Sequence, residues 1–80
     1  MEAPNHVREA VAQLGGIVRT AELLTGRGCP VSKSHVGRWC QEGSVFALEH
    51  AMALAELVHP GARASTARLA FLQQIRRADP

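Results

Sequence analysis

Polar and basic side chains are concentrated in one short stretch, Val31 to Gln41, which reads VSKSHVGRWCQ. Lys33, Ser34 and Arg38 carry N–H or O–H groups that can donate hydrogen bonds to base edges and phosphate oxygens. If the stretch is a helix, the positive end of its dipole also favours phosphate groups near its first turn. This set of side chains predicts a surface that binds a polyanion.

The positive charge is local. The chain of 80 residues carries a formal net charge of +2, which permits a nucleic-acid partner but does not require one. Four basic residues between positions 17 and 41 oppose one acid, whereas positions 42 to 59 hold three glutamates and no lysine or arginine. The basic residues are Arg19, Arg27, Lys33 and Arg38 against Glu22, and the acids that follow are Glu42, Glu49 and Glu56.

The spacing of apolar residues predicts five helices and no strand. We expect them over residues 6–14, 17 to about 25, 33 to 42, 44 to 58 and 65 to about 77. Asn5, Ser32 and Ser65 are suitable N-caps, and Gly43 is a suitable helix end. With 46% hydrophobic residues the chain should fold as one domain, residues 1–80.

The third predicted helix has two different faces. Val36, Trp39 and Cys40 fall on one face at helical spacing, which indicates a side buried in the core, and Trp39 is interpreted as a core residue. The small Ala21, at the centre of the second helix, lets the two helices cross closely. Residues 17–42 therefore have the pattern of a helix-turn-helix, whose second helix leaves its outer face free for the major groove.

The segments RTAELL and VSKSHVGRW resemble the Cro and lambda-repressor-like helix-turn-helix family, including its small YdaS-like branch of phage or plasmid regulators. The resemblance runs from about Val7 to Val58, and the matching positions are Ala21, Val31, Ser32, Val36 and Trp39. It implies that Lys33 and Ser34 read bases, that Gly37 also faces the groove, and that Arg38 meets phosphate.

The chain departs from this family in the turn, TGRGCPVS, which is longer by roughly five residues than the family pattern. The insertion either carries Arg27 out to a phosphate or extends the second helix. Its two glycines and proline favour a structured loop. The fifth helix is also additional, and its broad apolar surface predicts a dimer seam made by Leu69, Phe71, Leu72 and Ile75.

Other chemistries have less support. The chain lacks the closely spaced Cys or His pairs of structural zinc sites, so Cys29, His35 and Cys40 do not predict a metal. It has no glycine-rich phosphate loop and no nucleophile with an identifiable base, so we expect no enzyme. The two cysteines should be reduced, because neither a signal peptide nor an apolar stretch of ~20 residues is apparent and a cytoplasmic location is expected.

The sequence thus predicts an all-α, lambda-repressor-like domain with an added C-terminal helix, about 65–77, for dimerisation. We expect a homodimeric repressor that binds double-stranded operator DNA, with no cofactor, metal, membrane or small-molecule ligand. The predicted DNA contacts are Lys33, Ser34, His35, Gly37, Arg38, Arg27, Arg19 and Gln41, of which His35 is equally well explained as solvated. Arg76 and Arg77 are interpreted as solvated. The alternative is a protein-interaction module, such as an antitoxin or anti-factor that captures a protein partner.

Overall fold

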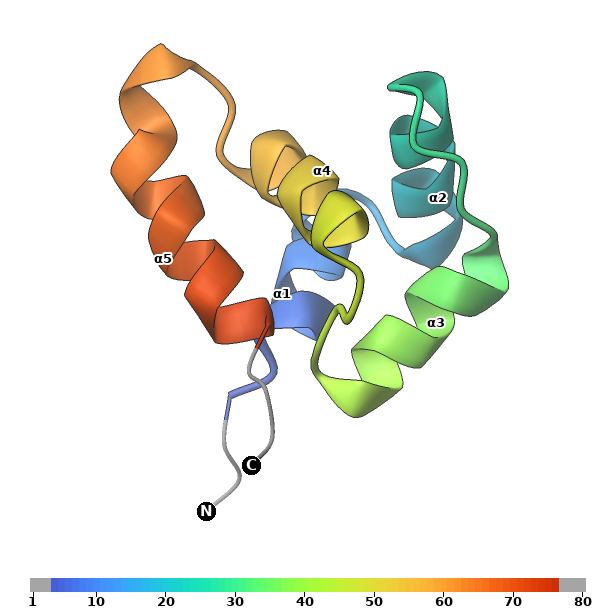
Figure 1. Ribbon diagram of the computed structural model, residues 1–80. Helices are drawn as coiled ribbons and strands as arrows, with labels where there is room; N and C mark the ends of the chain where they lie inside the picture. Colours follow the sequence, from blue (N-terminus) through green and yellow to red (C-terminus); the bar gives the residue numbers. More distant parts are fainter. Residues whose placement is uncertain (1–3, 77–80) are drawn as a thin grey trace.

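The computed structural model describes residues 4–76, and these form helices joined by short connections (Figure 1). The elements are α1 (His6–Gln13), α2 (Ile17–Gly26), α3 (Lys33–Glu42), α4 (Leu48–Val58), a 3₁₀ turn (Ala62–Ala64) and α5 (Ser65–Ile75). No strand occurs within the described range, so the predicted all-helical class with five α-helices is confirmed. The predicted end of the last helix at residue 77, and Arg77 itself, lie outside the described residues.

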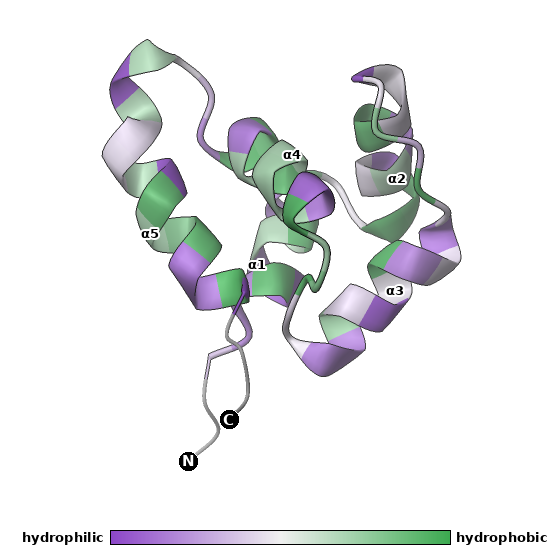
Figure 2. Ribbon diagram, viewed as in Figure 1, coloured by the Kyte–Doolittle hydropathy of each residue, from purple (hydrophilic) through white to green (hydrophobic). Residues whose placement is uncertain are grey.

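The core is made by one face of each helix. α1 lies centrally and contacts α2, α3 and α5, while α4 packs mainly against α5 (Figure 1). Apolar segments of α1, α4 and α5 face this interior (Figure 2). The core side chains are Val7, Ala10, Val11, Ala21, Leu24, Val36, Trp39, Cys40, Val45, Ala51, Leu54, Ala55, Phe71 and Ile75. The predicted inner face of the third helix, Val36, Trp39 and Cys40, is therefore confirmed.

The connection between α3 and α4 differs from the sequence prediction. A helix beginning near Ser44 is wrong, because residues 43–47 are not helical and α4 begins at Leu48. Val45 in this connection is fully buried, and its N–H donates to the carbonyl oxygen of Ile75 at 2.8 Å. This contact with the end of α5 holds the backbone away from the helical path.

The long turn after α2 is ordered by its own hydrogen bonds. The Cys29 N–H donates to the Leu24 carbonyl at 3.0 Å and the Gly28 N–H to the Thr25 carbonyl at 3.1 Å, the pattern of a Schellman motif. Gly28 has φ +86°, a backbone conformation that this motif requires and that glycine adopts without a steric penalty. α2 therefore ends at Gly26, about one residue beyond the predicted end, and the residues that follow close it.

Much of the apolar side of α5 packs against other helices of the same chain. Phe71 and Ile75 are buried in the monomer core, Leu72 is half-buried, and Leu69 is 58% exposed. Since α4 and α1 already cover Phe71 and Ile75, those two side chains do not lie on a surface that a second copy could reach. Two of the four residues predicted for the dimer seam are therefore internal, and of these four Leu69, with part of Leu72, remains on the outside of α5.

Candidate nucleic-acid interface

Local sequence signals fix both ends of α3. Ser32 has the extended backbone of an N-cap, and its Oγ accepts a hydrogen bond from the His35 N–H at 3.2 Å. At the other end the left-handed Gly43 closes the helix and donates its N–H to the Trp39 carbonyl at 2.8 Å. The predicted cap and the predicted end are both confirmed.

The inner face of α3 is held by packing and by one partly buried hydrogen bond. Val36 is fully buried and Trp39 is 6% exposed. The Trp39 ring lies against His50 of α4, with 5.5 Å between ring centroids. The side chain of Asn5, which also caps α1, donates from Nδ2 to the Cys40 carbonyl oxygen at 2.7 Å. These contacts orient α3 so that its opposite face is turned outward.

That outward face carries most of the predicted contact residues, and its ribbon is largely hydrophilic (Figure 2). Five predicted side chains from this helix are exposed: Lys33, Ser34, His35, Arg38 and Gln41. Neither Lys33 nor Arg38 makes an ion pair within residues 4–76. Ser34, His35 and Arg38 border a shallow hollow of about 100 Å³ beside Ser32. Two unpaired cations and three hydrogen-bonding groups thus share one exposed helix face.

His35 is oriented by its neighbours. Its Nδ1 lies 3.1 Å from the Ser32 Oγ, and its ring centroid is 6.3 Å from that of His50. The ring therefore stays close to the first turn of α3 instead of extending freely into solvent. This places an imidazole on the edge of the same exposed face, toward α4.

Gly37 lies at the border of this face, not at its centre. It is half-buried, and a Cβ atom built on it would be 3.9 Å from Cδ1 of Ile17, the first residue of α2. Gly37 and Gln41 also border a larger hollow of about 450 Å³, which Arg8 of α1 and Gly16 help to line. The middle of α3 thus packs beside the start of α2.

The start of α2 is a feature that the sequence reasoning missed. Its N-cap is Gly16, which provides no side-chain hydrogen bond, so the first N–H groups of α2 have no side-chain partner. Arg19, in the first turn, is exposed and lies 3.8 Å from Glu22, a loose surface pair. The absence of Ser, Thr, Asp or Asn directly before Ile17 is the sequence signal that indicates such an uncapped end.

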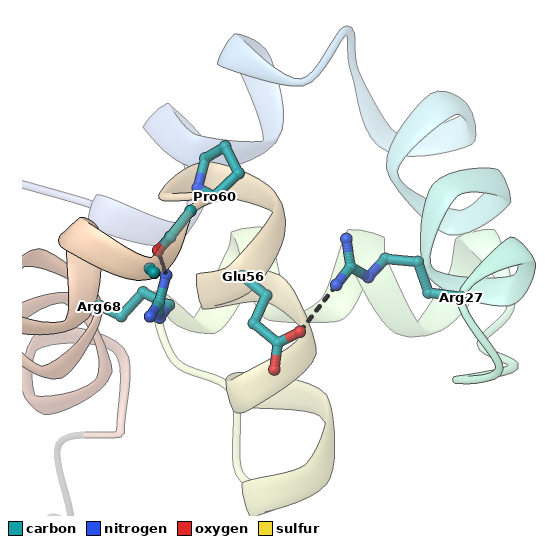
Figure 3. Close-up of a pocket in the computed structure, with 6 residues that line it drawn as sticks. Arg27, Glu56, Pro60 and Arg68 are labelled. Carbon is teal, nitrogen blue, oxygen red and sulfur yellow. Dashed lines mark hydrogen bonds and ion pairs between the residues drawn. The ribbon is translucent and has the colours of Figure 1, made fainter.

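Arg27 lies apart from the other predicted contacts. Its Nη2 is 2.7 Å from Oε1 of Glu56 on α4, so its guanidinium points toward α4 (Figure 3). The hollow beside this pair, about 390 Å³, also contains Arg68, which donates to the carbonyl oxygens of His59 at 2.8 Å and Gly61 at 2.6 Å. The Arg27 guanidinium is thus engaged within the chain, so the structure gives no support to the expectation that the long turn carries Arg27 out to a phosphate.

The cysteines belong to the scaffold. Cys40 is buried and Cys29 half-buried. Burial raises the pKa of both thiols, helped at Cys29 by the nearby charge of Glu49 and partly opposed at Cys40 by Arg8. Among residues 4–76 no three His, Cys, Asp or Glu side chains gather in a way that would hold a metal ion. Nor does the described part contain a helix with the length and apolarity needed to cross a bilayer.

Comparison with known proteins gives no relative from which a role can be transferred. No protein-family model, no curated protein and no solved structure matches this chain. The exposed face of α3 and the uncapped start of α2 are therefore interpreted from their own geometry and chemistry.

Proposed function

We propose that the chain is a sequence-specific DNA-binding transcriptional regulator with a lambda-repressor-like helix-turn-helix formed by α2 and α3. The observation that supports this most is the asymmetry of α3. Its inner face is anchored by Val36 and Trp39, whereas Lys33 and Arg38 are exposed without an ion-pair partner in the described chain. Because the core already holds the backbone of α3, binding to phosphate or a base has to order only these side chains and no backbone.

The dimensions of α3 suit the major groove. A helix of ten residues is about 15 Å long, and the major groove of B-DNA, about 12 Å wide, admits an α-helix. Lys33 and Ser34 stand in the first turn, the part of such a helix that meets base edges. Arg38 follows about one turn later, at a position from which it reaches a phosphate or a guanine.

The start of α2 supplies a second contact of a different kind. Its free backbone N–H groups and the positive end of its dipole favour a phosphate, and Arg19 adds a charge in the same turn. The start of α2 lies beside α3, since Ile17 approaches Gly37. One DNA strand can thus meet the start of α2 while α3 occupies the adjoining groove.

We further propose that two copies bind an inverted repeat and occupy a promoter, so that the protein acts as a repressor. Helix-turn-helix dimers place their reading helices about 34 Å apart, one turn of DNA, which fixes the expected spacing of the half-sites. A single recognition helix offers few base contacts, and a second copy doubles them. A phage or plasmid regulatory circuit is the setting that the sequence resemblance implies.

Operator selection from random duplexes, followed by fluorescence anisotropy near 100 mM salt, tests the proposal. Lys33→Ala should weaken binding to the selected site by about tenfold and reduce discrimination against mismatched sites, as expected for a lost base contact of ~1–3 kcal/mol. Arg27→Ala removes the same charge from a residue engaged with Glu56, so it should weaken binding less than threefold. Failure to select any sequence, or equal losses in the two variants, would contradict the proposed site.

A further inference from the structure

Large apolar side chains are exposed together where α4 begins. Phe46 is 92% exposed, Leu48 is 50% exposed and Met52 is 46% exposed. Leu48 and Met52 are four residues apart and share one face of α4, and Phe46 precedes the helix by two residues. These three residues are called the α4 apolar surface below.

Phe46 points outward because its neighbour is fixed inward. Val45 is fully buried and its N–H is bonded to the Ile75 carbonyl at 2.8 Å. In the non-helical segment that follows Gly43, this anchor leaves the next side chain on the solvent side. Phe46 contributes nothing to the core when 92% of it is exposed, and with Leu48 and Met52 it adds to an exposed apolar patch of the kind that marks interaction sites.

The surrounding charge limits what that partner can be. From Trp39 to Ala62 the chain has no lysine or arginine. The exposed Glu49 stands between Leu48 and Met52 in the sequence. Acidic surroundings repel nucleic acid and anionic lipid headgroups. The charge therefore favours an apolar protein surface as the partner.

We propose that the α4 apolar surface is covered by the same surface of a second copy, related by a two-fold axis. A two-fold interface requires a patch that complements itself, as three flexible or planar apolar side chains do, although the exposed Glu49 beside them is a like charge in both copies that weakens the contact. On α5, by contrast, Phe71 and Ile75 are already buried within the chain, which leaves Leu69 as an isolated exposed residue.

The place of this surface also suits two reading helices. Phe46 follows the end of α3 by only a few residues, so a two-fold axis through the α4 apolar surface places the C-terminal ends of the two α3 helices near that axis. This geometric step rests on the proposed function, whereas the exposure and charge described above do not depend on it.

The exposed area is sufficient for a weak dimer. With roughly 200 Å² for a large side chain, the three exposed fractions give roughly 370 Å² of apolar area per copy. Two copies then bury about 740 Å², and at an apolar share of about 60% the whole interface covers about 1,200 Å², the lower limit of specific interfaces. We therefore expect a dimer that dissociates on dilution to micromolar concentrations.

Sedimentation equilibrium of the full chain without DNA tests the interface. The protein concentration runs from about 10 µM to about 1 mM, on the order of the dissociation constants of weak specific contacts. The unmodified chain should be dimeric at the upper end, and Phe46→Ser should raise the dissociation constant by at least about tenfold. Leu69→Ser is the control, because it replaces an apolar residue on α5 that is 58% exposed and lies outside the α4 apolar surface, and it should leave the dimer unchanged. Met52→Ser provides a second interface variant should Phe46→Ser unfold, which circular dichroism detects.

Three results would overturn the proposal: a chain that remains monomeric at the highest concentration, a dimer unaffected by Phe46→Ser and Met52→Ser, or a dimer lost only in Leu69→Ser. Fluorescence anisotropy with a duplex that carries one half-site distinguishes failure of the proposed dimer interface from failure of DNA binding. Phe46→Ser should bind one half-site like the unmodified chain but lose cooperativity on two. A dimer without DNA binding refutes the proposed function alone, and half-site binding by a chain that never dimerises refutes this interface alone.

Discussion

Replacing Gly37 with alanine should stabilise the protein. Glycine inside a helix costs roughly 0.5–1 kcal/mol relative to alanine, because it has more backbone freedom to lose on folding. Gly37 lies in the middle of α3, and its φ is not positive, so alanine adopts its conformation without strain. The added Cβ would lie 3.9 Å from Cδ1 of Ile17, an ordinary van der Waals contact. The expected gain in unfolding free energy is therefore about 1 kcal/mol.

Thermal and urea denaturation, followed by circular dichroism and by the fluorescence of Trp39, measure this gain. For a domain of this size, 1 kcal/mol corresponds to a rise in Tm of about 4–8 °C. Gly43→Ala is the matched control, since Gly43 has φ +73° at the end of α3. Alanine in that left-handed conformation should lower the unfolding free energy by about 1 kcal/mol.

The same variant also tests where Gly37 lies relative to DNA. If Gly37 packs at the border beside Ile17, Gly37→Ala should change affinity for the selected site less than about twofold, because one methyl group at the edge removes no hydrogen bond. A lower Tm would refute the packing of α3 against the start of α2. A higher Tm with a large loss of affinity would instead place Gly37 against the DNA, as the family resemblance implies.

Three further predictions concern buried and half-buried side chains: two substitutions and one measurement of cysteine reactivity. Thr20 is fully buried and its Oγ1 has no hydrogen-bond partner, so Thr20→Val should raise the unfolding free energy by about 1 kcal/mol in urea titrations, and a loss would show that the hydroxyl is satisfied. Ile75→Ala should lower it by about 2–4 kcal/mol, since Ile75 is fully buried, and a change in dimer mass at unchanged stability would restore the α5 seam. Because thiolate is the reactive form and burial raises the pKa of both thiols, Ellman's reagent at pH 8 should label both cysteines of the folded chain more slowly than free cysteine. Labelling should accelerate as the pH rises, and labelling as fast as free cysteine would contradict the burial.

Features set by neighbours in the sequence were predictable. The i, i+3, i+4 spacing of Val36, Trp39 and Cys40 gives a continuous stripe on any helix, and that stripe is buried. Ser32 caps α3 because its hydroxyl reaches an N–H three residues on, a contact that depends on local geometry alone. The exposed side chains of α3 follow directly from these two signals.

Features set by distant residues were not predictable. The start of α4 depends on the hydrogen bond from Val45 to Ile75, thirty residues later, and the direction of Arg27 depends on Glu56, twenty-nine residues away. The apolar stripe of α5 has the same pattern whether its own chain or a second copy covers it. Only the packing of α5 on α4 and α1 decides that Phe71 and Ile75 are internal.

The long turn between α2 and α3 is tied to the C-terminal end of α2. Gly28 and Cys29 close α2 on Thr25 and Leu24, and the Val31 N–H lies 3.4 Å from the Thr25 Oγ1. Contact between Gly37 and α2 is made at the other end, at Ile17, about 13 Å along the helix axis from Gly26. α3 is therefore positioned against α2 at two places, by the Thr25–Val31 hydrogen bonds just before its start and by Gly37 beside Ile17 in its middle. If the chain binds DNA as proposed, shortening the turn should therefore disturb Lys33, which follows the turn directly, as well as the Arg27–Glu56 pair.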